Sequence, residues 1–270
     1  MHNNTALLWE KQTRLLSARQ MFDVELTTAC NKHCYICPRD RLIRQRAMMT
    51  QARFEALCHW LPADCDVFFA GFGEPLLHNS CVDFVRRLHD SGRGTSIMTN
   101  GNLLTREKAD ELFIAGLDKL QISIISKTEL PLISCFESLI SDKYRNRVIF
   151  NIIKDSAVED PQTELNEMRR NGWRFCIKQI HNRAGALYPA DYMGELKTCG
   201  TFFCDTFIDA AGEIHVCSND INGCNNIGNI KKVSFQNLID FKRKFLGNKQ
   251  ICPLCASCID EYRLKHFEEV

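Results

Sequence analysis

The sequence has no apolar run near the roughly 18 residues that a membrane-spanning helix needs, and its first residues lack the apolar core of a signal peptide. Its 270 residues carry a formal net charge of only +1. No excess of one charge sign therefore points to nucleic acid or to an anionic membrane surface. Together these absences predict a soluble cytoplasmic protein that binds neither nucleic acid nor a membrane.

A disulfide scaffold is also a poor explanation for this chain. It contains 15 cysteines, an odd number, and no secretory signal accompanies them. Five cysteines are scattered through apolar or helical stretches, where we expect small buried hydrophobic side chains: Cys58, Cys65, Cys81, Cys135 and Cys176. The other ten fall into two groups, one near each end of the chain, and these groups predict metal chemistry.

The first group is the stretch Cys30-Asn-Lys-His-Cys34-Tyr-Ile-Cys37, directly after the strand-like run 21–26. Three thiolates on one short loop suit a soft metal or an iron–sulfur cluster. Because cubane clusters usually take four protein thiolates, three would leave one iron open for a small ligand. A zinc site is the alternative for this loop taken alone. The basic segment Arg39–Arg46 that follows is either a solvated loop or a flap whose arginines bind a carboxylate or phosphate of a ligand.

Strand-like and helix-like segments alternate along most of the chain. The strands are expected at 21–26, 66–70, 95–99, 120–125, 147–153 and 174–180, with helices over 50–61, 80–90, 105–115, 131–141 and 161–171 between them. This alternation favours parallel strands joined by right-handed crossovers. Six such units are too few for a closed eight-fold barrel. The sequence therefore predicts an α/β fold, a partial (β/α)6 TIM-like barrel, preceded by an N-terminal helix over 1–20.

Polar residues follow several of the expected strands. Gly71-Phe-Gly-Glu-Pro75, Asn100 and Ser123 all stand at or just after strand ends. In such folds the chemistry lies at the C-terminal ends of the strands. Each feature alone is an ordinary turn or a satisfied polar group, but together with the cysteine loop they are expected to meet at one barrel mouth.

Taken in order, these motifs make residues 21–180 resemble the core of the radical S-adenosylmethionine (SAM) enzymes. The resemblance implies that Cys30, Cys34 and Cys37 bind a [4Fe–4S] cluster whose fourth iron holds SAM through its amino and carboxylate groups. Reductive cleavage of SAM in that family gives a 5′-deoxyadenosyl radical, which abstracts a substrate hydrogen. An electron donor such as flavodoxin or ferredoxin is then the expected protein partner.

The remaining motifs imply a SAM site. Gly71-Phe-Gly-Glu-Pro75 resembles the family's GGEP motif with Phe72 inserted, and Glu74 or nearby backbone carbonyls would accept the SAM ammonium. Asn100 matches the family's TNG motif, and Ser123 a polar residue of the fourth strand. Two further polar residues occupy comparable places on the fifth and sixth strands, Asn151 and Gln179. The sequence departs from the family at Ile36, where an aromatic residue usually precedes the last cysteine.

The second cysteine group belongs to residues 191–270, which we expect to form a unit separate from the core at 21–190. Strands over 206–209 and 213–216 around an Ala-Gly turn, then a helix from Ser234 to about Leu246, are predicted here. The unit resembles the SPASM/twitch appendage of radical SAM enzymes. The resemblance implies an auxiliary [4Fe–4S] cluster with the ligands Cys199, Cys217, Cys255 and Cys258, and with Cys204 or Cys252 as alternates. Seven cysteines are too few for two full cubanes, and a zinc ribbon is the alternative use of four thiolates.

Cys224 fits neither cysteine pattern. It is either a loop thiol without a role or a hydrogen-atom donor, the part that a lone cysteine plays in some related epimerases.

The leading functional reading is an enzyme that oxidises or epimerises a small sugar- or aminocyclitol-like substrate. Only about twenty residues precede the core, which favours a small substrate over a peptide that needs a recognition domain. The alternative is a maturase that epimerises or cross-links a ribosomally made peptide. Outside enzymes, an iron–sulfur electron carrier or a zinc-ribbon binding protein is the competing class.

Overall fold

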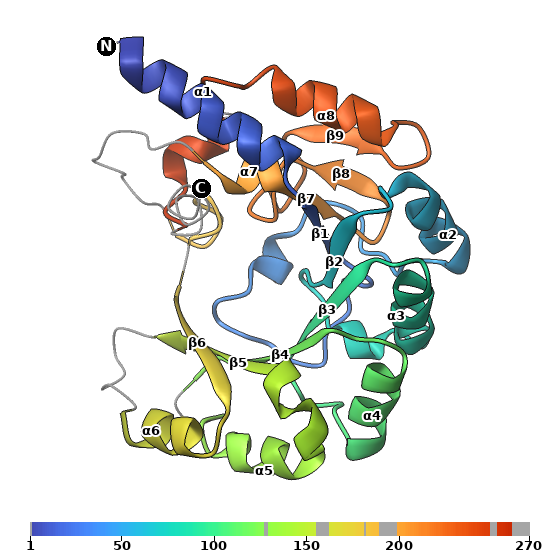
Figure 1. Ribbon diagram of the computed structural model, residues 1–270, viewed down its shortest axis with the longest axis vertical. Coiled ribbons are helices and arrows are strands. Elements are labelled where there is room, and N and C mark those ends of the chain that lie inside the picture. Colours follow the sequence, from blue (N-terminus) through green and yellow to red (C-terminus); the bar gives the residue numbers. More distant parts are fainter. Residues whose placement is uncertain are drawn as a thin grey trace.

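Six parallel strands form the centre of the molecule in a computed structural model, which describes residues 2–126, 129–154, 162–180, 182–188, 199–248 and 253–260. The strands are β1 (Gln20–Val24), β2 (Cys65–Phe69), β3 (Gly94–Thr99), β4 (Lys119–Ile124), β5 (Val148–Lys154) and β6 (Arg174–Gln179). Each pairs in parallel with the next along the chain, and the sheet they form is curved (Figure 1). The predicted α/β partial barrel is confirmed.

Helices cover the outer face of this sheet (Figure 1). They are α2 (Gln51–Trp60), α3 (Cys81–Asp90), α4 (Arg106–Ile114), α5 (Leu132–Leu139) and α6 (Gln162–Arg170). The hydroxyls of Thr50 and Thr105 accept hydrogen bonds from backbone N–H groups in the first turns of α2 and α4, so these threonines are the N-caps of the two helices. Short 3-10 helices η1 (Pro38–Arg41), η2 (Pro75–Leu77) and η4 (Asp142–Arg147) lie in the connecting loops.

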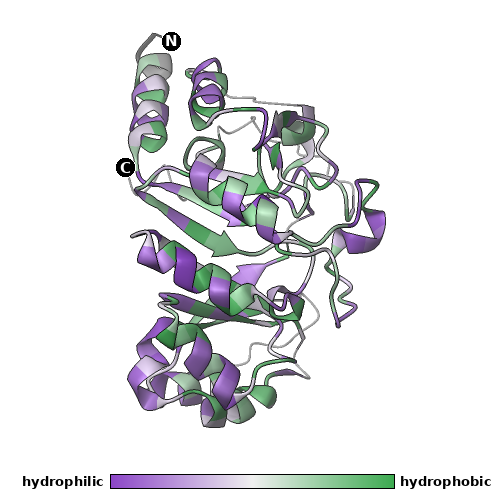
Figure 2. Cartoon of the chain, turned by 90° about the vertical axis from the view of Figure 1, so that its right-hand side faces the viewer, coloured by the Kyte–Doolittle hydropathy of each residue, from purple (hydrophilic) through white to green (hydrophobic). Residues whose placement is uncertain are grey.

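Successive strand residues face opposite sides of the sheet, and this alternation separates the core from the site. On β1, Phe22 and Val24 are fully buried toward the helices, whereas Asp23 between them is half-buried and faces the interior. The same hydrophobic layer continues through the other strands and the inner faces of the helices. Figure 2 shows it as green strands beside helices whose outer faces are purple.

The C-terminal segment extends this same sheet. β7 (Asp205–Ile208) pairs in parallel with β1, while β8 (Glu213–His215) and β9 (Asn226–Asn229) add antiparallel strands, giving the order β6-β5-β4-β3-β2-β1-β7-β8-β9. The predicted hairpin is confirmed, and its turn contains Gly212 with a φ of 85°, a conformation that suits glycine. The pairing of β7 with β1 was not predicted, because nothing local in the sequence specifies which strand a new edge strand joins.

The first helix packs on this C-terminal part of the sheet. α1 (His2–Ser17) lies beside α7 (Thr201–Cys204) and α8 (Phe235–Arg243) (Figure 1). Leu15 and Leu16 are buried there, whereas Leu7 is 53% exposed. The buried Gln12 side chain fixes the contact, because its amide donates to the Asn248 carbonyl (3.0 Å) and accepts from a backbone N–H.

The scattered cysteines only partly match their prediction. Cys65 and Cys81 are buried, Cys58 and Cys176 are intermediate, and Cys135 is exposed. The prediction was wrong for Cys135 because α5 is short and presents this position to solvent.

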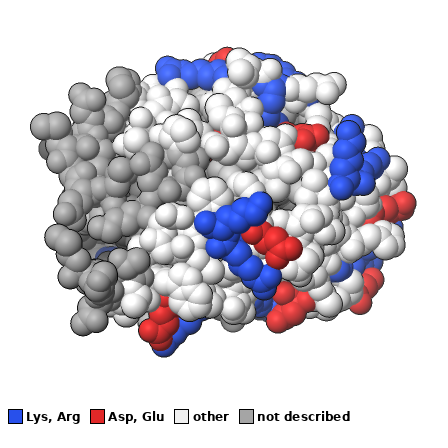
Figure 3. Space-filling view, turned by 90° about the horizontal axis from the view of Figure 1, so that it is seen from above, with Lys and Arg blue, Asp and Glu red and all other residues white. Residues whose placement is uncertain are grey.

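In the described part of the chain, no helix is both long and apolar enough to cross a membrane. Basic and acidic side chains are interspersed with uncharged ones on the face shown in Figure 3.

Candidate functional site

One cavity of about 280 Å³ opens at the C-terminal ends of the parallel strands. Every residue predicted for the core site lines it: Cys30, Cys34, Cys37, Gly71, Gly73, Glu74, Asn100, Ser123, Asn151 and Gln179. Residues far apart in the sequence therefore meet at one barrel mouth, as the strand-end positions predicted. The C-terminal part of the sheet supplies a further wall through Phe207 and Ser218.

The cysteine loop is held by contacts that leave its thiols at the cavity. The Arg39 guanidinium donates to the backbone carbonyls of Cys30 and Lys32, both at 3.1 Å, so it braces the loop from within. The Asn100 amide lies 3.6 Å from the Cys30 sulfur and donates to the Asn31 side chain (2.8 Å). Burial raises the pKa of the Cys34 and Cys37 thiols, so metal binding there would release their protons.

These residues fit a three-thiolate cluster site. Three thiols on one loop face a shared cavity, which is the donor set that an iron–sulfur cluster uses. A nearby amide can hydrogen-bond to a cluster sulfur, a contact of the kind that tunes such centres. Among the described residues no group of three or more His, Cys, Asp or Glu side chains is gathered closely enough for a single metal ion.

The Gly71–Pro75 loop lies directly on the backbone of the cysteine loop. The Glu74 N–H donates to the Ala29 carbonyl (2.8 Å). A β-carbon added at Gly73 would collide with the carbonyl oxygens of Thr27 and Ala29. Glycine is therefore required at Gly73 so that the two loops can touch.

The Glu74 carboxylate is turned toward the protein and is 2% exposed. It accepts hydrogen bonds from the Thr99 hydroxyl (2.7 Å), the Asn100 N–H (2.8 Å) and the N–H of Leu76 (3.1 Å). Burial raises the pKa of Glu74, and these three donors oppose the rise. Of the two predicted acceptors for a SAM ammonium, the geometry therefore favours the backbone carbonyls, with Glu74 fixing the end of β3.

The polar residues on β4 and β5 lie side by side in the sheet. Ser123 is the register partner of Asn151, and both side chains face the cavity. The Asn151 amide donates to the side-chain oxygen of Gln121 (2.8 Å), so one of its two N–H donors is already used within the protein. Ser123 is half-buried, which makes it the better placed of the two for a ligand contact.

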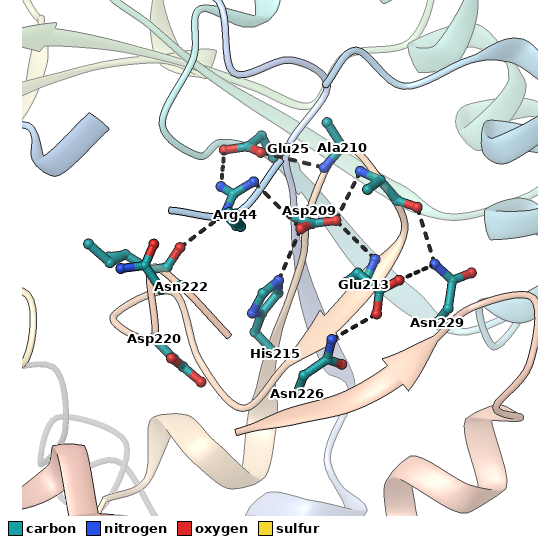
Figure 4. A network of polar contacts seen from close by, with 12 residues as sticks. Glu25, Arg44, Asp209, Ala210, Glu213, His215, Asp220, Asn222, Asn226 and Asn229 are labelled. Carbon is teal, nitrogen blue, oxygen red and sulfur yellow. Dashed lines mark hydrogen bonds and ion pairs between the residues drawn. The ribbon is translucent and has the colours of Figure 1, made fainter. Parts of the chain in front are cut away.

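The predictions for the basic segment after the cysteine loop are wrong for Arg44, whose side chain is 8% exposed. Its guanidinium donates to Glu25 (2.8 Å) and lies 3.5 Å from Asp209, and it also donates to the Ile221 carbonyl (3.0 Å) (Figure 4). Arg44 is thus neither solvated nor facing the cavity. It joins the loop to both halves of the sheet.

The acceptors of Arg44 form a buried network that the sequence reading missed. Glu25 is 1% exposed, and its carboxylate also accepts the N–H of Phe72 at 2.9 Å. Asp209 accepts from His215 at 3.2 Å and from backbone N–H groups of its own hairpin (Figure 4). The only signal in the sequence was the position of Glu25, a carboxylate inside the apolar run 21–26.

The network also sets the charge state of Asp209. Burial raises its pKa, but the hydrogen bonds from His215 and the Glu213 N–H, with the nearby Arg44 charge, outweigh it and hold the pKa below its usual value. Asp209 therefore stays ionised and can pair with Arg44.

The cysteines predicted as auxiliary ligands lie in the C-terminal part of the chain, where Ser218, the neighbour of Cys217, lines the cavity. Burial raises the pKa of the Cys217 thiol, and the thiols of Cys199 and Cys258 raise it further, so these three groups lie close together. Cys255 packs against the same apolar cluster, and its carbonyl accepts the N–H of Cys258 (3.3 Å). The four residues predicted as auxiliary ligands thus lie in one part of the fold, but the described structure gathers no three of them closely enough for a single metal ion.

Of the two alternate ligands, Cys204 and Cys252, only Cys204 lies among the described residues. The Cys204 thiol is buried in α7 and lies 3.6 Å from the Gly200 carbonyl, and burial raises its pKa to about 12. Cys252 lies outside the described residues. Cys224 is exposed on the loop between β8 and β9, and it is not among the described residues that line the cavity.

Comparison with known proteins matches a sequence profile of the radical SAM superfamily to residues 24–155. Among curated relatives, a "Probable GTP 3′,8-cyclase" of Methanothermobacter thermautotrophicus is 36% identical over 103 residues, which are 37% of this chain and 33% of the relative. The chain spans about a third of the length of the first curated relatives that it matches.

Solved structures match over nearly the whole chain. BtrN in complex with AdoMet and 2-DOIA has a TM-score of 0.68 at 20% identity, covering 90% of this chain and 94% of that one. Streptococcus suis SuiB bound to its precursor peptide SuiA has a TM-score of 0.62 at 12% identity, covering 92% and 72%. At these identities the likeness establishes the fold, including that of the C-terminal part.

Proposed function

Since the chain belongs to the radical SAM superfamily through its domain at 24–155, we propose that it abstracts a hydrogen atom from a small sugar- or aminocyclitol-like substrate. The outcome is oxidation or epimerisation, with the help of an auxiliary [4Fe–4S] cluster. One observation carries this proposal: the predicted cluster and SAM residues line a single cavity, to whose wall the C-terminal part of the chain adds Phe207 and Ser218. When bound, the cluster and SAM supply the 5′-deoxyadenosyl radical.

The chain's own residues would divide the work as follows. Cys30, Cys34 and Cys37 hold the cluster, and the backbone of the Gly71–Pro75 loop receives the ammonium of SAM. Glu74 keeps this loop against the end of β3 through its three hydrogen bonds. Ser123 faces the cavity as a contact for the ribose or carboxylate of SAM.

The auxiliary cluster would be held by the four C-terminal cysteines: Cys199, Cys217, Cys255 and Cys258. Ser218, which follows Cys217 in the chain, lines the cavity, and this supports an electron acceptor close to the substrate. An external donor of the flavodoxin or ferredoxin class would supply the electron for SAM cleavage.

The small-substrate reading is supported by BtrN, which was solved with 2-DOIA and which this chain matches almost completely, at a TM-score of 0.68. The extent of the match does not by itself separate the substrate classes, because anSMEcpe, solved with the Kp18Cys peptide, also matches almost completely, at a TM-score of 0.64. A peptide maturase remains the second candidate because SuiB shares the fold. The GTP 3′,8-cyclase relatives match over too little of their length for their substrate to be transferred.

The test is anaerobic reconstitution followed by an assay for 5′-deoxyadenosine formed from SAM with dithionite. The wild type should form it, and Cys34→Ala should not. Iron and sulfide of about eight each per chain indicate two cubanes, and about four of each with one zinc indicates the ribbon. No 5′-deoxyadenosine above background with both clusters loaded would contradict the proposal and favour an electron carrier.

A further inference from the structure

An acidic residue that the proposed SAM site does not use faces the cavity from β1. Asp23 is the register partner of Phe68 on β2 and of Phe207 on β7. All three side chains line the cavity, so they form one row across three adjacent strands. This row places a carboxylate between two aromatic rings on the wall where the core meets the C-terminal strands.

In the described structure, no hydrogen bond to the Asp23 carboxylate contributes to its pKa. Burial, and then the charge of Asp205, raise its pKa well above the usual value, while the positive charges of Arg183 and Lys178 oppose this rise. A half-buried carboxylate without a donor is costly to maintain. Such a group at a cavity wall is typical of a ligand-binding position.

Two cations approach Asp23 from the end of β6. Lys178 and Arg183 both line the cavity. Arg183 has a left-handed backbone, with a φ of 50°, and its guanidinium stacks 5.6 Å from the centre of the Phe72 ring. It also lies 3.5 Å from the Asn219 side-chain oxygen, so its position is fixed.

Arg183 stands between the two cysteine groups. Burial lowers the pKa of Arg183, and the nearby groups Asp260, Cys37 of the first loop, Asp23 and Cys217 of the second group oppose this. A substrate that receives the radical on one side and passes an electron to the auxiliary cluster on the other must occupy this region. Asp23, Lys178 and Arg183 therefore surround the place where the substrate belongs under the proposed function.

We propose that Asp23, Lys178 and Arg183 form a substrate subsite for a neutral vicinal diol, as found in cyclitols and sugars. The inference rests on the proposed function and names its substrate chemistry. Asp23 accepts a hydrogen bond from one hydroxyl, and the two cations donate to the oxygen of the neighbouring hydroxyl. Phe68 and Phe207 pack against the carbon skeleton.

The mixed charges argue against other groups at this position. A phosphate or carboxylate would meet the cations, but its charge would further oppose ionisation of Asp23, which burial and Asp205 already oppose. An isolated ammonium would meet Asp23 but would be repelled by the two cations. A pair of neutral hydroxyls uses the acceptor and the donors together and introduces no unpaired charge.

The test is equilibrium dialysis of labelled scyllo-inositol against the reconstituted full-length protein with SAM present and no reductant. Asp23→Asn should weaken binding about tenfold or more, because it removes a charged acceptor. Lys178→Met should weaken it as well, which provides a second variant if Asp23→Asn folds poorly. Asp66→Asn is the matched control, since Asp66 is a neighbouring strand residue that pairs with Arg19 outside the cavity (3.1 Å).

Inorganic phosphate is the second probe in the same dialysis, because an anion site predicts the opposite effect of Asp23→Asn on binding. If the subsite binds anions, phosphate should bind and Asp23→Asn should strengthen it by removing a like charge. Phosphate binding that Asp23→Asn strengthens would overturn the inference. Equal scyllo-inositol binding by the wild type and Asp23→Asn, or no scyllo-inositol binding by the wild type, would overturn it as well. Dialysis involves no SAM cleavage, so a wild type that binds scyllo-inositol but forms no 5′-deoxyadenosine would contradict the proposed function instead.

Discussion

The two cysteine regions reach their positions by different means. In the core, Cys30, Cys34 and Cys37 lie on one loop whose place is fixed by the end of β1 and by Arg39. The C-terminal cysteines come from separate segments: Cys199 precedes α7, Cys217 follows β8, and Cys255 and Cys258 lie in and after η5. The first site is thus encoded locally and the second depends on long-range packing, so damage to the sheet junction should affect the second site first.

The largest expected effects separate the two cluster sites. Cys34→Ala should lose one cluster and with it all formation of 5′-deoxyadenosine, because the SAM-binding iron would be gone. Cys217→Ser should lose the same amount of iron but keep 5′-deoxyadenosine formation and lose only product formation. Iron analysis with chromatography of SAM products would check both. Equal loss of 5′-deoxyadenosine in the two variants would mean that the sites are not independent.

The junction between the regions should respond strongly to removal of one buried charge. Arg44→Met leaves Glu25 and Asp209 without their cation and should lower the free energy of unfolding by about 3–5 kcal/mol. Anaerobic denaturant unfolding measures this. In the double variant with Glu25→Gln the further loss should be small, since the two residues act together. Fully additive losses would show that the pair is not coupled.

Glu74 should matter to a lesser degree and for the core alone. Glu74→Gln puts an amide where the carboxylate accepts backbone N–H groups, and it should cost about 1–3 kcal/mol of stability. It should also raise the KM for SAM, because the loop is no longer held against β3. The exposed Glu111→Gln is the control and should change stability by less than about 0.5 kcal/mol. A KM equal to that of the wild type would remove the positioning role.

The C-terminal part contains a buried lysine whose titration can be followed. Burial lowers the pKa of Lys242 to about 8, below its ordinary value of 10.5. Between these values the unfolded chain binds more protons than the folded one, so this residue's contribution to stability should rise with pH from about 8 to 10.5. Lys242→Met should abolish this rise in denaturant midpoint. An unchanged slope in the variant would assign the pH dependence to other groups.

The smallest effect is expected at Cys224. It is exposed and is not among the described residues that line the cavity, so Cys224→Ala should leave product identity and rate within about twofold. The exposed Cys135→Ala serves as its control. Loss of net inversion with SAM cleavage retained would instead restore the role of hydrogen-atom donor.

Local signals in the sequence predicted most of the core. The alternation of strands and helices and the strand-end motifs were sufficient for the barrel and for the composition of its mouth, because each depends on neighbours in the sequence. The Glu25–Arg44–Asp209 network was missed because its members are distant in sequence and look like solvated residues when read alone. The extension of the sheet through β7 and the inward turn of Glu74 likewise depend on contacts that only the folded chain brings together.

The most direct test is the electron paramagnetic resonance spectrum of the dithionite-reduced protein with and without SAM. A quadruple variant with alanine at Cys199, Cys217, Cys255 and Cys258 isolates the cluster of the first loop. The signal of this cluster should change when SAM is added, because the iron that lacks a cysteine ligand binds SAM. A loaded cluster with a spectrum that SAM leaves unchanged would contradict the assignment of the cavity as a SAM site.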